Sequence, residues 1–284
     1  MQSFFKKKII IITIVFQGIT FAVGPQFLSI PLNTSELVSG INPSIINLSN
    51  APMISVSYGN WLADINVSSM SYDRSLFKGW GGLTFRYISI NDLELRTERP
   101  SDEPLSHYSS TAYAFDAKYV RQFKFGLMTV TIRYLAIQLY DESANGISGD
   151  LSLQKKLNKN LNIGVALLNM GSMSKLYEEV PKLPFRALAG GTYQFDIKQI
   201  RNNISISLEK SSLVNGVIFR FSESVDLNKI QFSIGTQMAE KSMSLAGGIN
   251  IKLGSYKFGY GVQIGTQTLG VPQFITLQMI LPKD

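Results

Sequence analysis

The stretch SYKFGYGVQIG, residues 255–265, decides the fold class because its side chains alternate between two kinds. Apolar residues occupy every second position, namely Tyr256, Phe258, Tyr260, Val262 and Ile264. Successive side chains of an extended strand point to opposite faces of a sheet. The stretch is therefore a strand with one apolar, aromatic-rich face and one face of lysine, glycine and glutamine. A soluble sandwich would turn the apolar face into its core, whereas a membrane barrel would turn it outward into lipid.

Segments with the same period of two fill most of the chain, and no Pro- or Ser-rich linker interrupts them. Short polar or glycine-containing stretches separate these segments, as expected between antiparallel strands. The pattern predicts fourteen strands, roughly at 53–59, 61–72, 79–90, 107–121, 126–140, 147–157, 160–170, 184–196, 202–210, 213–223, 229–238, 244–253, 255–265 and 271–281.

The lengths of the predicted connections favour the barrel. Bacterial outer-membrane barrels have an even number of strands, short periplasmic turns and longer outer loops. If the first strand runs outward, the two longest connections, 91–106 and 171–183, both fall on the outer side. Lipid cannot satisfy the hydrogen bonds of an open sheet edge, so the last strand must pair with the first. We therefore expect an all-β fold, a transmembrane antiparallel barrel over residues 53–284, with a secreted β-sandwich pair as the alternative.

The N-terminal region predicts export and a separate short segment before the barrel. Residues 1–22 carry three lysines, then an apolar run from Ile9 to Phe16, then small residues up to Ala22. This is the layout of a secretory signal peptide, and the apolar run is too short to span a membrane. Residues 23–52 do not alternate cleanly, which predicts either a plug inside the lumen or a flexible periplasmic lead-in. The expected location is the outer membrane of a Gram-negative bacterium.

Composition excludes several classes of function. Without the three signal-peptide lysines, 24 Lys and Arg stand against 20 Asp and Glu, and the basic residues form no stripe, so nucleic acid is not an expected partner. The chain has no cysteine and one histidine, His107, so we expect no metal site, no cofactor and no enzymatic activity. Asp64 and Arg133 could line a polar lumen, or Asp64 could pair with a lumen arginine.

Several short motifs follow one another in an order that resembles the PorV/PorQ family of outer-membrane proteins. They are FLSIPLNTSELVSG, INPS, ISVSYGNWLADINV, GDLSLQKKL, IGVALLNMGSM and LPFRALAGGTYQF, and together they span most of the chain after residue 22. The resemblance implies a barrel similar to the fourteen-stranded FadL-type fatty-acid channels. The N-terminal segment departs from the family pattern, because LNTSELVSG is shorter than the family's segment. The residues that match family motifs are Asn42, Pro43, Trp61, Asp64, Asn169 and Gly171.

The resemblance implies a non-enzymatic role in type IX protein secretion or in surface attachment of exported cargo. Its expected partners are outer-membrane lipid and, through the outer loops, type IX components or cargo proteins. The loop residues expected to bind such partners are Glu94, Arg96, Glu98, Arg99, Leu176 and Tyr177. The alternative is a FadL-like channel for uptake of hydrophobic small molecules, which requires an apolar pocket between plug and wall.

Overall fold

The computed structural model describes residues 24–45, 48, 51–95, 103–198, 200–266 and 269–282. The predicted signal peptide, residues 1–22, lies outside the described residues. None of the described helices is long and apolar enough to cross a membrane.

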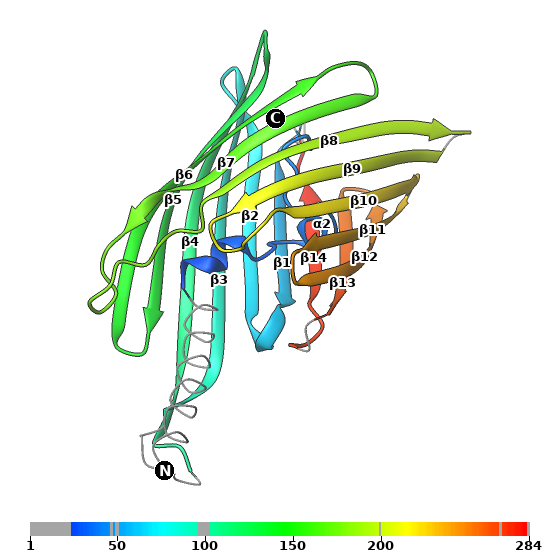
Figure 1. Ribbon diagram of the computed structural model, residues 1–284. Helices are drawn as coiled ribbons and strands as arrows, with labels where there is room; N and C mark the ends of the chain where they lie inside the picture. Colours follow the sequence, from blue (N-terminus) through cyan, green and yellow to red (C-terminus); the bar gives the residue numbers. More distant parts are fainter. Residues whose placement is uncertain are drawn as a thin grey trace.

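The described chain forms one closed antiparallel barrel, in which each strand pairs with its neighbours in sequence and β14 pairs with β1 (Figure 1). The strands are β1 Met53–Asn60, β2 Asn66–Leu76, β3 Gly79–Leu95, β4 Ser106–Phe123, β5 Gly126–Leu139, β6 Glu142–Lys156, β7 Leu161–Met173, β8 Arg186–Ile197, β9 Ile200–Ser211, β10 Ile218–Leu227, β11 Ile230–Ala239, β12 Ser242–Leu253, β13 Tyr256–Gly265 and β14 Gln273–Ile280.

Closure follows the register of the two terminal strands. Met53 lies opposite Ile280 and Asn60 lies opposite Gln273, so the whole of β1 is paired on this side. The predicted count of fourteen strands and the predicted pairing of the last strand with the first are both confirmed. The sandwich alternative is wrong, because a sandwich leaves its two sheets open at their edges.

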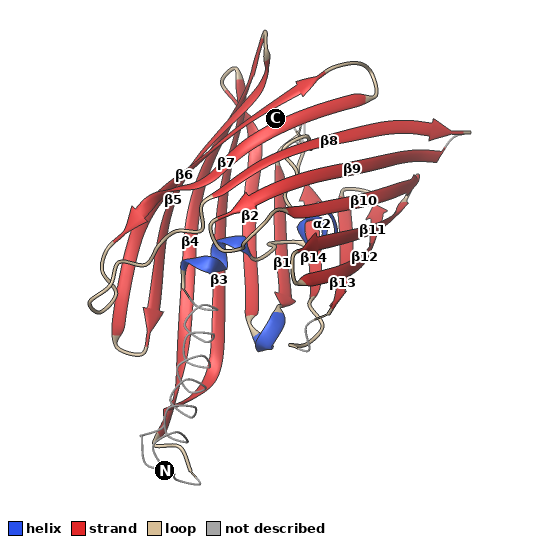
Figure 2. Ribbon diagram, viewed as in Figure 1, coloured by secondary structure: helices blue, strands red, loops and turns tan. Residues whose placement is uncertain are grey.

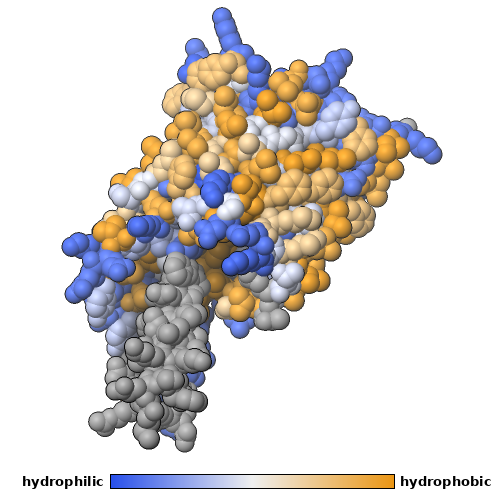
Figure 3. Space-filling view, in the orientation of Figure 1, coloured by the Kyte–Doolittle hydropathy of each residue, from blue (hydrophilic) through white to orange (hydrophobic). Residues whose placement is uncertain are grey.

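The outer face of the wall is apolar, as the alternation of residues 255–265 requires. Tyr256, Phe258, Tyr260 and Ile264 are between 44% and 63% exposed, whereas Gly259 and Gly261 between them are buried. Hydrophobic residues cover the visible wall of the barrel, and hydrophilic ones gather toward its ends (Figure 3). The aromatic face of the opening stretch is therefore the lipid-facing side of the barrel.

The two ends of the barrel differ in the length of their connections. The end that we call the turn rim consists of six short hairpin connections, at 76–79, 123–126, 155–161, 196–201, 226–230 and 252–257. The opposite end, the loop rim, consists of residues 60–66, 91–95, 103–108, 139–143, 173–185, 211–218, 239–242, 265–266 and 269–273.

The longest predicted loops are shorter than expected. β3 continues to Leu95 because a β-bulge between Ile90 and Leu93 carries its pairing with β4 past the point where the alternation breaks. The predicted loop at 91–106 therefore shrinks to the residues between Leu95 and Ser106, and β7 likewise extends to Met173. Both connections still lie on the loop rim, as the strand parity predicts.

Residues 24–45, which we call the plug segment, lie inside the barrel (Figure 2). The segment contains the short helices η1 Pro25–Ser29 and α2 Thr34–Ser39. The Asn33 side chain caps α2 by accepting a hydrogen bond from the Glu36 backbone, and Gly40 ends the helix with a φ of 65°. This placement is the one expected of a plug and not of a flexible lead-in.

An apolar cluster holds the first half of the plug segment against the wall near the loop rim. Phe27 is completely buried, and Leu28, Ile30 and Leu37 are buried beside it. The cluster stabilises the plug segment by removing this apolar surface from water. The wall residues in the cluster are Ile65, Val67, Ile88, Ile90, Ala112, Ala114, Leu135, Ile137, Ala144, Met173 and Phe274.

Candidate functional site: the plugged lumen

A row of buried charged side chains crosses the lumen face of β3 to β7. Arg86 Nη2 donates to Asp116 Oδ2 at 2.8 Å, and Arg133 Nε donates to Asp116 Oδ1 at 2.7 Å. Arg133 also reaches Asp150 at 2.9 Å and Asn169 Oδ1 at 2.7 Å. Two guanidinium groups and two carboxylates thus alternate along the wall, so that each charge has a partner of opposite sign.

A second row continues around the wall on β8 to β11. Arg186 holds Glu209 by two hydrogen bonds, at 2.6 and 2.7 Å. Arg220 Nη1 donates to the same carboxylate at 2.7 Å, and its Nε donates to Gln237 at 2.8 Å. Since two arginines share one glutamate, this second row carries one net positive charge.

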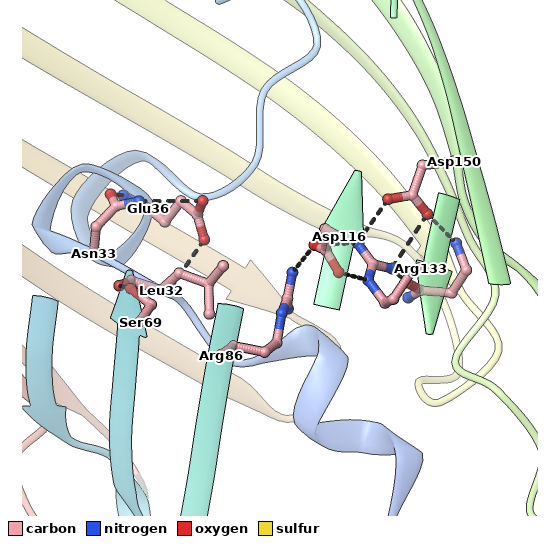
Figure 4. Close-up of polar contacts among 9 residues, drawn as sticks. Leu32, Asn33, Glu36, Ser69, Arg86, Asp116, Arg133 and Asp150 are labelled. Carbon is pink, nitrogen blue, oxygen red and sulfur yellow. Dashed lines mark hydrogen bonds and ion pairs between the residues drawn. The ribbon is translucent and has the colours of Figure 1, made fainter. Parts of the chain in front are cut away.

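The plug segment lies against both rows. Glu36 accepts hydrogen bonds from the Leu32 backbone at 2.9 Å and from the Asn33 side chain at 3.3 Å, within the plug segment itself. Figure 4 shows this turn of the plug segment beside Arg86, the first residue of the row that leads to Asp150. On the other side, a side chain at Gly40 would collide with Arg220, which packs against the plug backbone.

Polar contacts with the wall fix the middle and the end of the plug segment. The Thr34 and Thr276 hydroxyls are 3.0 Å apart, and the Leu32 carbonyl accepts from Ser69 at 2.8 Å. Farther along, the Asn42 amide donates to the Ile206 carbonyl at 3.3 Å, and the Ser44 hydroxyl lies 2.6 Å from that of Thr192.

Two wall glycines let the plug backbone approach the wall closely. A Cβ atom at Gly235 would collide with the Val38 carbonyl, and one at Gly164 would collide with the Pro43 carbonyl. Neither site leaves room for a larger residue while the plug segment keeps this position.

A cavity of about 150 Å³ separates the plug segment from the wall on the loop-rim side. Its apolar lining includes Ile30, Leu37, Trp61, Ile218 and Ala246. Its polar lining comes from the second charged row, from Glu36 of the plug segment, from Gln263 and from several serine and threonine side chains. Arg186 contributes to that lining, and among the described residues its buried Nη1 has no hydrogen-bond partner. The cavity can therefore hold a small apolar molecule and satisfy one polar or anionic substituent.

Two further cavities, each of about 240 Å³, lie on the turn-rim side of the plug segment. One is bounded by Asn42 and Pro43 together with Trp80 and Lys118. The other is bounded by Lys229, Lys252 and Lys257. The plug segment thus stands between free space on the loop-rim side and free space on the turn-rim side.

The lumen contains four of the six family-motif residues. Asn42 and Pro43 belong to the plug segment, Trp61 lines the loop-rim cavity, and Asn169 donates to the Pro184 carbonyl at 2.9 Å besides holding Arg133. Gly171 instead lies at an exposed position of β7, paired with Ser148.

Asp64 and His107 lie at the loop rim and outside the lumen. Asp64 is exposed on the short helix η2 Leu62–Asp64, and no ion pair among the described residues includes it. The alternative that Asp64 pairs with a lumen arginine is therefore wrong, whereas Arg133 does line the lumen. His107 is at the start of β4, and its Nδ1 lies 2.6 Å from Oδ1 of Asp92 on β3. Among the described residues no group of three His, Cys, Asp or Glu could hold a metal ion.

The loop residues expected to bind partners lie on the loop rim as far as the structure describes them. Glu94 is near the end of β3, and Leu176 pairs with Glu179 in an isolated bridge. Tyr177 at the tip of that bridge is 77% exposed. Arg96, Glu98 and Arg99 lie outside the described residues. A partner for these loops stays a prediction.

Sequence reasoning missed most of the charged rows. Arg86, Arg186 and Arg220 each stand between apolar residues, in TFRYI, PFRAL and IFRFS, at positions opposite the lipid-facing side chains. An arginine in the middle of an alternating strand is a signal for a lumen ion pair, since a barrel turns that face inward. The same signal is present at Arg133, the one residue of the two charged rows that was expected to line the lumen.

Comparison with known proteins supports the class of the fold. No protein-family model matches the chain, and no curated protein sequence matches it. A TodX deltaS2S3 mutant, a monoaromatic hydrocarbon channel, has a TM-score of 0.62 at 9% identity, covering 88% of this chain and 99% of that one. The CymD monoaromatic hydrocarbon channel has a TM-score of 0.56 at 10% identity, covering 91% and 97%. The Acinetobacter baumannii outer membrane protein Omp33 gives a TM-score of 0.49 at 7% identity, covering 83% and 100%.

The fold is therefore that of outer-membrane β-barrel channels, closed with fourteen strands and occupied by an N-terminal plug segment. At these identities the similarity concerns the fold alone.

Proposed function

We propose that this chain is an outer-membrane channel for uptake of small, largely apolar molecules, and that the plug segment closes it. The observation that carries the proposal is the cavity between plug segment and wall, with further free space beyond the plug segment. The fold similarity to two monoaromatic hydrocarbon channels supports the same class of cargo.

The size and lining of the loop-rim cavity define the cargo more closely. An apolar cavity of about 150 Å³ is large enough to bind benzene. Trp61, Ile218 and Ala246 offer such a surface, while Arg220 and Gln237 lie at its polar side. The proposed cargo is a single aromatic ring or a short aliphatic chain, with at most one polar substituent.

Passage through the lumen requires the plug segment to move. Its backbone touches the wall at Gly164 and Gly235, so no molecule can pass between them while the contacts hold. The second half of the plug segment is held by the packing of Ile41 against the small apolar cluster of Ala166, Leu168 and Leu188 and by hydrogen bonds, each of which contributes on the order of 1 kcal/mol. A displaced second half of the plug segment would connect the loop-rim cavity with the space near the turn rim.

Filling the cavity should abolish binding of a ring-sized molecule. Ala246 is 5% exposed and lines the cavity, so Ala246→Phe should place a ring where the ligand ring would lie. Bromobenzene, a heavy-atom quencher, should quench the fluorescence of Trp61 with a saturable component in the parent chain. We expect Ala246→Phe to weaken that component at least about tenfold, because the buried contact area is lost.

Ala189→Phe is the matched control, because Ala189 is exposed on the lipid face of β8 and should leave saturable quenching unchanged. Trp61→Phe should remove the saturable signal and leave only the linear quenching of Trp80 and detergent background. Equal saturable quenching in the parent chain and in Ala246→Phe would contradict binding in this cavity.

Secretion of exported proteins is the second candidate, and the observation that favours it is the exposed tip of the β7–β8 connection. Tyr177 is 77% exposed there, beside the exposed Glu178 and Glu179. Removal of 176–180 should leave uptake of labelled toluene by cells unchanged if the channel proposal is right. Retention of surface proteins in the periplasm after this deletion, with uptake insensitive to Ala246→Phe, would favour the secretion role.

A further inference from the structure

Every hairpin of the turn rim carries an exposed lysine. The six connections follow different strands and have different sequences, yet none lacks a cation at its surface. These exposed lysines are Lys78, Lys124, Lys155, Lys156, Lys159, Lys198, Lys229 and Lys252.

Each of the same hairpins also exposes a large apolar side chain within two residues of a lysine. The exposed fractions are 93% for Phe77, 54% for Phe125, 51% for Leu157, 55% for Ile197, 43% for Leu227 and 56% for Leu253. Phe77 has a φ of 52°, a left-handed conformation that a bulky residue rarely adopts. Folding alone therefore gives no reason for a phenylalanine at this tip, since it is strained and makes almost no contact with the rest of the chain.

The charge of the turn rim has the opposite sign to that of the loop rim. Among the described residues, the turn rim has ten Lys and Arg against two Asp, whereas the loop rim has nine Asp and Glu against three Lys. Within the described turn rim the one ion pair is between Arg201 and Asp196, at 3.8 Å. The positive charge of this end is therefore largely uncompensated by the protein.

Cations beside exposed apolar tips fit the boundary between a membrane and water. Lysine stems lie along apolar surface while their ammonium groups reach outward, and anionic headgroups meet those groups at the same depth. An apolar tip beside each lysine can enter the acyl boundary below the headgroups. A soluble acidic protein would satisfy the charge but would leave six apolar tips, spaced around a ring, without a common apolar surface.

We propose that the turn rim is a docking surface for anionic phospholipid headgroups of the membrane leaflet on that side. The inference rests on the placement of the barrel in a membrane and not on what the lumen transports. The ring of lysines then holds a shell of phosphatidylglycerol-like lipids, and the apolar tips fix the depth of the barrel in the leaflet.

A tryptophan at the tip of the β2–β3 hairpin can report on the lipids beside it. Phe77→Trp, reconstituted in phosphatidylcholine bilayers with increasing brominated phosphatidylglycerol, should be quenched more strongly than by the same amount of brominated phosphatidylcholine. Each lysine near an anionic surface favours association by a factor of about five at low salt, so we expect at least a fivefold preference. The preference should fall toward one in 1 M salt, because screening shortens the reach of these charges.

Matched variants separate this surface from general membrane charge. A triple variant changes Lys78, Lys124 and Lys198 to Gln. It should reduce the preference of the tryptophan at position 77 for the anionic lipid at least about fivefold. The control changes Lys175, Lys182 and Lys241 of the loop rim to Gln, and it should leave the preference unchanged. Tyr177→Trp, on the loop rim, should show no preference for the anionic lipid.

Three results would overturn the proposal: equal quenching by both lipids at position 77, an unchanged preference in the turn-rim triple variant, or an equal preference at position 177. If the turn rim bound an acidic protein more strongly than anionic vesicles, its partner would be that protein and not lipid. Bromobenzene binding tests the channel proposal separately. If the chain binds no bromobenzene, the channel proposal fails, but the three lipid results still test the turn rim.

Discussion

Deletion of the plug segment, residues 24–45, should convert the closed barrel into an open pore. Fourteen strands enclose more space than wall side chains alone can fill, since about eight strands already give a filled interior. Because no strand includes any of residues 24–45, the deletion leaves all fourteen strands and their closure intact. In planar bilayers we expect the deletion to raise single-channel conductance about tenfold or more over the full chain.

A milder pair of variants tests the same closure without shortening the chain. Gly235→Val and Gly164→Val push against the Val38 and Pro43 carbonyls, so each should raise conductance in the same direction. Gly247→Val is the control, because Gly247 lies on β12 opposite the exposed Ile234, on the lipid face, with open space around its Cβ. A correctly folded deletion variant with the conductance of the full chain would show that the plug segment does not close the lumen.

Removal of Arg133 should have the largest effect on stability. Its guanidinium group holds Asp116 and Asp150, so Arg133→Met leaves the buried carboxylate of Asp116 and the partly buried one of Asp150 with Arg86 as their one remaining ion-pair partner. Breaking a buried ion pair from one side costs about 3–5 kcal/mol. We expect a loss of that size in the free energy of unfolding, measured by urea titration of the protein in lipid vesicles.

Lys118→Met is the matched control for this loss. Lys118 also pairs with an aspartate, Asp73 at 2.8 Å, but the two side chains are 40% and 27% exposed. A solvated pair of this kind contributes at most about 1 kcal/mol. If Arg133→Met costs no more than Lys118→Met, the charged rows do not stabilise the barrel in the way their burial implies.

The fold could be predicted from sequence because lipid-facing and lumen-facing residues alternate along each strand of a barrel. The stretch at 255–265 fixes which side chains face lipid, and the parity of the connections places the long loops at one rim. Strand ends were less predictable, because a bulge such as that after Ile90 shifts the alternation without ending the strand.

The charged rows could not be predicted, because they depend on register between strands. Asp116 lies directly opposite Arg133, whereas Arg86 and Arg220 reach their carboxylates diagonally, past the residue directly opposite. Local sequence does not set these offsets. The contacts of the plug segment could not be predicted for a similar reason. Nothing in the local sequence distinguishes Gly164 and Gly235 from other strand glycines, and their role follows only from the position of the plug backbone.

The most direct measurement of the central claim, that cargo passes the plug segment, is uptake with the plug locked in place. The chain has no cysteine, and the Ser44 and Thr192 hydroxyls are 2.6 Å apart, so Ser44→Cys with Thr192→Cys can form a disulfide between the second half of the plug segment and the wall. Uptake of labelled toluene should be lost in the oxidised double variant and restored by a reductant, while each single variant stays active under both conditions. Equal uptake by the oxidised and reduced double variants would contradict passage through the lumen.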